Sequence, residues 1–174
     1  MASPTSAATL RDGRSGPNDP QFALILPMPK VPRVQVIHDG DTVRVGPLAL
    51  VATLTPGHTA GGTTWSWQSC EGTRCLGLVY ADSQTPISDD TFRFSGDVRY
   101  PQARTDFSRG HAAIERMRCD ILITPHPGAS RLWERLAQRD GAAPALVDPT
   151  ACQRYATASR ASLDARLAKE RAKP

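Results

Sequence analysis

The sequence contains 174 residues, of which 40% are apolar and 6% aromatic, and 21 lysines and arginines against 17 aspartates and glutamates give a formal charge of +4. This length suits a single domain. The basic residues are spread along the chain without interleaved aromatic residues, and no apolar run approaches the roughly 18 residues of a membrane-spanning helix. We therefore expect neither a nucleic acid nor a membrane as a partner.

Residues 1–32 are expected to form a short helix followed by a loop. Residues 1–12 are rich in serine and alanine, and seven glycines and prolines in residues 13–32 exclude regular structure. The N-terminus lacks the basic and then apolar order of a signal peptide. Our hypothesis is that Met1 is an internal methionine of a longer protein, which an in-frame stop codon directly upstream would contradict. The domain itself is placed at residues 33–174.

A hairpin and a strand are predicted next. Residues 34–37 and 42–45 are alternating runs on either side of an Asp-Gly-Asp turn at residues 39–41. An Asp-Gly turn between alternating runs is a strong hairpin signal. Residues 46–47, Gly-Pro, then turn the chain into a strand at residues 48–54.

One histidine lies in a tight turn directly after that strand. Pro56 fixes φ and Gly57 permits a sharp reversal, so His58 is expected to project from the end of the strand. Imidazole is the commonest metal ligand and titrates near neutrality, and functional side chains are often mounted on such loops. Taken alone, however, a histidine in this position is more often an ordinary turn residue.

Two strands follow, at residues 63–69 and 76–80. The first is rich in threonine and tryptophan, which favour strands, and it places Trp65 and Trp67 on one face. A packed or half-buried strand face is favoured over a ligand platform for these two side chains.

The four cysteines favour an oxidising compartment. Cys70 and Cys75 flank a four-residue hairpin loop, and a disulfide across such a loop is geometrically reasonable where the two positions face each other. Cys119 and Cys152 remain as the other two. The alternative is four reduced thiols in a cytosolic protein.

Polar and helical segments occupy the centre of the chain. Ser83 and Thr85 follow the strand that ends at residue 80, where hydroxyl groups either hold a carboxylate or water or cap a loop. Residues 88–101 are expected to be a loop anchored by two phenylalanines, and residues 102–118 a helix. His111 lies on the apolar face of that helix, so a structural role is favoured for it.

A second histidine, His126, repeats the arrangement of His58. It follows a short apolar strand, residues 119–124, and a proline. Two histidines at strand ends suit a metal or acid–base site. Beyond it, Ser130 is expected to cap a helix at residues 131–139, which a break at residues 141–144 ends, and a last helix opens at Asp148-Pro149 and frays past Lys169.

Three stretches together resemble the class B metallo-β-lactamases, and most closely their third subclass, which has serine where other subclasses have a zinc-ligating cysteine. They are T-P-G-H-T-A-G-G-T at residues 55–63, V-Y-A-D-S at residues 79–83 and C-D-I-L-I-T-P-H-P at residues 119–127. The resemblance covers roughly residues 19–155. It implies an α/β (α+β) fold: the C-terminal half of an αββα sandwich, with a mixed sheet and flanking helices.

The resemblance also implies roles for individual residues. By it, His58 is a ligand of the first of two zinc ions and His126 a ligand of the second, while Ser83 and Thr85 contact substrate or active-site water. It further implies two disulfides, Cys70–Cys75 and Cys119–Cys152, and a periplasmic or secreted location.

The activity implied is zinc-dependent hydrolysis of the β-lactam amide bond, and hence antibiotic resistance, in which bound zinc supplies hydroxide near neutral pH. The family's H-x-H-x-D-H motif is missing from this sequence, so each zinc would keep one of three protein ligands. We therefore expect an inactive fragment with weak or absent zinc binding, whose partner is the missing N-terminal half. Two alternatives remain open: a non-catalytic binding remnant, and another hydrolase of the same fold, such as a thioesterase or lactonase.

Overall fold

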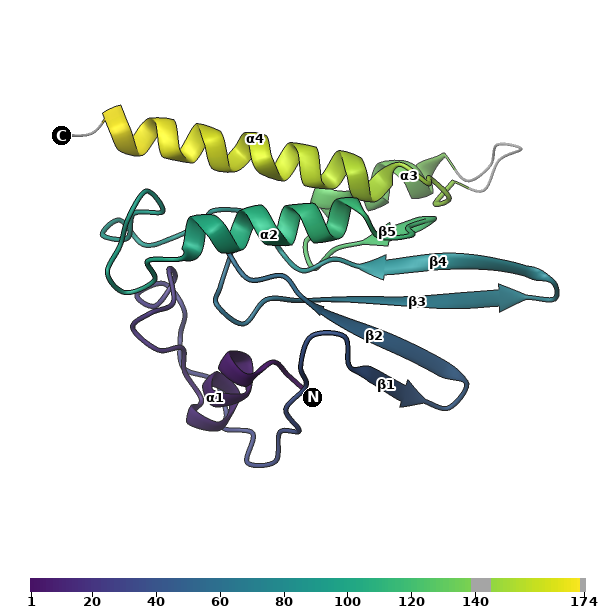
Figure 1. Ribbon diagram of the computed structural model, residues 1–174, viewed down its shortest axis with the longest axis horizontal. Helices are drawn as coiled ribbons and strands as arrows, with labels where there is room; N and C mark the ends of the chain where they lie inside the picture. Colours follow the sequence, from purple (N-terminus) through teal and green to yellow (C-terminus); the bar gives the residue numbers. More distant parts are fainter. Residues whose placement is uncertain (139–144, 173–174) are drawn as a thin grey trace.

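A computed structural model describes residues 1–138 and 145–172 of the chain. Its five strands form one mixed sheet in the order β1-β2-β3-β4-β5, in which only β5 is parallel to its neighbour (Figure 1). The predicted mixed sheet with flanking helices is therefore confirmed. The elements are α1 (Pro4–Asp12), β1 (Thr42–Val45), β2 (Leu48–Leu54), β3 (Thr63–Glu71), β4 (Arg74–Tyr80), α2 (Ala103–Glu115), β5 (Ile121–Ile123), the 3₁₀ turn η1 (Pro127–Ser130), α3 (Leu132–Ala137) and α4 (Ala151–Ala172). No helix in these ranges is long and apolar enough to cross a membrane.

The two faces of the sheet differ in what covers them. On one face Val79 and Leu122 are buried against α2 and α4, in a cluster that includes Ile114 and Tyr155. Alternate residues of a strand point to opposite faces. The other face therefore carries Trp65 with its cross-strand neighbour Tyr80, and Trp67 with Leu78, and none of these four side chains is fully buried.

A second core cluster joins the loop between β4 and α2 to the two long helices. Phe92 and Phe94 are 1% and 2% exposed, as expected of anchors, and pack with Phe107 of α2 and Leu163 of α4. Glu170 of α4 accepts hydrogen bonds from the backbone N–H groups of Phe94 (3.0 Å) and Ser95 (2.8 Å). These bonds hold the end of α4, so the prediction that the helix frays past Lys169 is wrong: it runs to Ala172.

The first hairpin lies elsewhere than predicted. β1 pairs with β2 through a turn at residues 46–47, where Gly46 has φ +57°, and not with residues 34–37. Instead Val36 forms a parallel bridge with Ala2, and the Asp39 carboxylate accepts the N–H of Leu54. The sequence has two turn signals seven residues apart, at residues 39–41 and 46–47. Because residue 36 pairs with Ala2, the hairpin forms at the second signal.

The segment after β5 also differs from prediction. Ser130 does not cap a helix, because its hydroxyl lies 3.2 Å from the Pro127 carbonyl and 3.0 Å from the Thr124 hydroxyl and bonds within that network. Arg131 instead stands in the left-handed region, with φ 52°, and α3 begins after it. The predicted end of this helix at residue 139 and the break at residues 141–144 lie outside the described residues.

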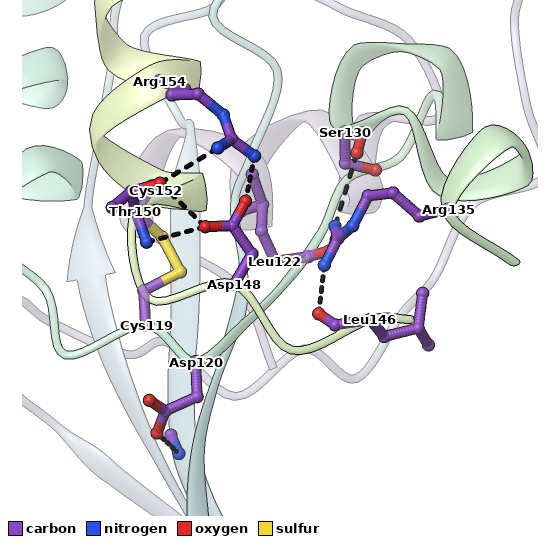
Figure 2. The surroundings of a disulfide bond; sticks show 11 residues. Cys119, Asp120, Leu122, Ser130, Arg135, Leu146, Asp148, Thr150, Cys152 and Arg154 are labelled. Carbon is purple, nitrogen blue, oxygen red and sulfur yellow. Dashed lines mark hydrogen bonds and ion pairs between the residues drawn. A yellow bond between two sulfur atoms is a disulfide. The ribbon is translucent and has the colours of Figure 1, made fainter. Parts of the chain in front are cut away.

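Both expected disulfides are present. Cys70 and Cys75 face each other across β3 and β4 with their Cα atoms 4.0 Å apart. Cys119, just before β5, is bonded to Cys152 at the start of α4 (Figure 2). Beside this bond the Arg135 guanidinium donates to the carbonyls of Leu122, Ser130 and Leu146, which ties α3 to β5.

Candidate functional site

His58 lies on the turn between β2 and β3, which is packed tightly against α2. Gly57 has φ +139°, and a Cβ there would lie 2.6 Å from the ring of Phe107, so only glycine fits. On the other side the hydroxyls of Ser3 and Ser6, at the start of α1, donate to the Gly61 carbonyl at 2.7 and 3.0 Å. The position of His58 is therefore set by both α2 and α1.

Hydrogen bonds on both sides fix the orientation and the tautomer of the His58 ring. Nδ1 lies 2.6 Å from the carbonyl oxygen of Thr85. Since a carbonyl only accepts, Nδ1 carries the proton, and Nε2 of the neutral ring presents its lone pair. The side-chain nitrogen of Gln21 lies 3.1 Å from Nε2 and donates to it. Three segments thus meet at one imidazole.

The segment after β4 carries the predicted polar residues and is anchored by α4. The Tyr155 hydroxyl donates to the Asp82 carbonyl (3.0 Å) and accepts the N–H of Gln84 (3.1 Å). Ser83 is 8% exposed, whereas Thr85 is exposed and contacts His58 through its carbonyl group. Of the two predicted substrate contacts, the structure brings only Thr85 into direct contact with His58.

Asp82 lies close to His58, a feature that the sequence did not reveal. The two residues line one cavity of about 290 Å³ together with Ser3 and Trp65. Burial raises the pKa of the Asp82 carboxyl, although backbone hydrogen bonds at Ser83 and Thr63 act in the opposite direction. The only sequence signal was a carboxylate directly after a strand, which does not distinguish a site from a loop cap.

The other three histidines do not join this arrangement. His126 is exposed beyond the end of β5, where its carbonyl accepts from the Thr124 hydroxyl at 2.8 Å. His38 lies on the surface 3.7 Å from Asp41, and His111 is buried, as expected of a structural residue.

The donor set does not fit a complete zinc site. Within residues 1–138 and 145–172, no three histidine, cysteine, aspartate or glutamate side chains are grouped so that they could hold a metal ion. A catalytic zinc normally takes three protein ligands. The lone pair of His58 that faces outward is, moreover, already hydrogen-bonded to Gln21.

Several solved structures are similar to this chain in sequence and fold. The Rm3 metallo-beta-lactamase is 45% identical, with a TM-score of 0.95, and the match covers 98% of this chain and 64% of that one. MEM-A1, a subclass B3 metallo-beta-lactamase from a soil metagenome library, is 38% identical (TM-score 0.95; 99% and 66% covered). MIM-1 from Novosphingobium pentaromativorans is 39% identical (TM-score 0.88; 99% and 61% covered). No protein-family model matches the sequence. The chain thus spans slightly less than two thirds of the length of these structures.

Proposed function

This chain is a structural relative of the subclass B3 metallo-β-lactamases, and from that premise we propose that it carries the C-terminal part of a zinc-dependent enzyme that hydrolyses the β-lactam amide bond. The single observation that carries the proposal from fold to site is the 2.6 Å contact between His58 Nδ1 and the Thr85 carbonyl oxygen, from which the tautomer follows. Histidines that bind metal characteristically donate their other ring N–H to a carboxylate or a carbonyl group. His58 does so to Thr85, which leaves Nε2 as the ligand atom.

Each site residue then has a proposed role. His58 is a ligand of the first zinc ion and His126 of the second, and Ser83 and Thr85 orient the substrate. The match leaves about one third of the related structures uncovered. We propose that a segment similar to that uncovered part supplies the remaining zinc ligands. Because the residues that the structure describes do not complete either metal site, we assign no hydrolytic step to them alone.

The same segment is the proposed partner of the chain. Trp65, Trp67, Leu78 and Tyr80 form an apolar sheet face that is only partly buried, and a second layer of structure would remove it from water. The two disulfides support an exported protein, because such bonds persist in the periplasm or outside the cell.

The test is a fusion of the N-terminal third of the Rm3 enzyme to this chain. We expect hydrolysis of nitrocefin, a β-lactam, that needs zinc and is lost with a chelator. His58→Ala or His126→Ala removes a metal ligand, so each should lower kcat/KM by at least about 100-fold.

The matched control is His38→Ala, which changes an exposed histidine outside the site and should leave turnover unaltered. If the fusion kept near-full activity with either His58 or His126 replaced, the ligand assignment would be wrong. Turnover of a thioester or lactone with no turnover of nitrocefin would instead favour another hydrolase of the same fold.

A further inference from the structure

His58 is a proposed zinc ligand, but the lone pair that would bind the metal is already used in a hydrogen bond. Nε2 of a neutral imidazole has one lone pair, which lies in the plane of the ring and accepts one partner. In this chain that partner is the Gln21 amide, at 3.1 Å. A zinc ion bonds such a nitrogen at about 2.0–2.1 Å, so the amide and the metal exclude each other.

Gln21 is held in place by its own segment. Its N–H donates to the Asp19 carboxylate at 2.8 Å, and the neighbouring carbonyl, that of Pro20, accepts the N–H of Asp89 at 2.9 Å. These bonds fix the approach of the amide toward His58 from the loop at residues 13–32.

We propose that Gln21 is a positioning residue whose side-chain amide occupies the metal-binding lone pair of His58, so that a divalent metal binds there only by displacing that amide. The proposal rests on the proposed function's assignment of His58 as a metal ligand, and it does not depend on β-lactam hydrolysis. Gln21 and Thr85 together hold the ring in the tautomer that a metal requires, and Gln21 alone competes with that metal.

The experiment is a zinc titration of the 174-residue chain followed by two-bond ¹H–¹⁵N correlation spectra of the histidine rings. Without zinc, the wild-type His58 should show a protonated Nδ1. Gln21→Ala removes the competing donor, so zinc should shift the His58 Nε2 resonance at roughly two- to tenfold lower concentration, the range expected of one neutral hydrogen bond.

Two further variants make the result decisive. Gln21→Glu also lacks an N–H donor, and its carboxylate is itself a zinc ligand, so it should bind zinc at least as tightly as Gln21→Ala. Gln68→Ala, on the exposed end of β3, should behave as the wild type. Equal zinc affinity at His58 in the wild type and both Gln21 variants would overturn the proposal while leaving the ligand assignment intact. If zinc perturbed His58 in none of them, the ligand assignment would fail, and this proposal with it.

Discussion

At the scale of single residues, His111 shows how one buried side chain links stability to pH. It is 1% exposed, its Nε2 has no partner among the described residues, and its ring lies 5.6 Å from that of Phe107. Burial lowers the pKa of His111 to about 4, with Arg160 of α4 acting in the same direction and Asp164 opposing it. The ring is therefore neutral in the folded protein at pH values where the unfolded chain is already protonated.

The stability contributed by this neutral ring is fully present above about pH 6.5 and is lost as the pH falls toward 4. In that range His111 binds a proton in the unfolded chain but not in the folded protein, so the fall in pH favours unfolding. Between pH 7 and pH 5 the free energy of unfolding should fall by about 2 kcal/mol from this group alone. Urea unfolding at the two pH values measures it. His111→Leu should remove most of the dependence and His38→Asn none; an unchanged slope in His111→Leu would contradict the assignment.

Some residues of the candidate site could be predicted from the sequence and others could not. The turn around His58 could be predicted because Pro56 and Gly57 restrict the backbone locally. The hydrogen bond of Gln21 to the histidine and the position of Asp82 in the same cavity could not, since these residues lie 37 and 24 positions away along the chain and their approach depends on how the loops pack.

At the scale of elements, prediction succeeded where local pattern determined the structure. The β3–β4 hairpin follows from alternating residues on both sides of its turn, and α2 follows from a repeating apolar face. The first hairpin and the start of α3 were misplaced, because a contact with Ala2 decided one and a hydroxyl network around Ser130 the other.

The junction of the His58 turn with α2 gives a prediction at this scale. Gly57→Ala would force a Cβ to within 2.6 Å of the Phe107 ring at a φ of +139°, and strain together with overpacking should cost about 2–4 kcal/mol of stability. Gly40→Ala is the matched control: its φ is +81°, but nothing lies within 4 Å, so about 1 kcal/mol is expected. Urea midpoints compare the two, and an equal cost would show that packing on α2 is not the cause.

At the scale of the whole molecule, the sheet has one face covered by α2 and α4 and one that is only partly buried (Figure 1). This agrees with the predicted half of an αββα sandwich, since half of such a fold leaves one sheet face without its second layer. The motifs, which suggested a match over residues 19–155, did not predict that it would extend to α1 and the end of α4, over 98% of the chain.

The ligand count gives the prediction for the chain by itself. Residues 1–174 should show no measurable nitrocefin turnover with added zinc, and should retain no fixed number of zinc ions after dialysis, because no described group of three ligands exists. Metal analysis and absorbance assays measure this. Turnover that a chelator abolishes, together with two tightly held zinc ions, would overturn the fragment interpretation.

The order of strands in the sheet also bears on how the protein folds. Short connections join β1 to β4 in succession, whereas the parallel pairing of β5 with β4 closes a separation of 43 residues, from Leu78 to Ile121. Closing the longer loop costs more chain entropy before any contact compensates for it. We therefore expect the β1–β4 meander to gain protection first in pulsed hydrogen exchange and β5 last. The end of the sheet that bears His126 would then be completed only in the final step, when Cys119 comes within reach of Cys152.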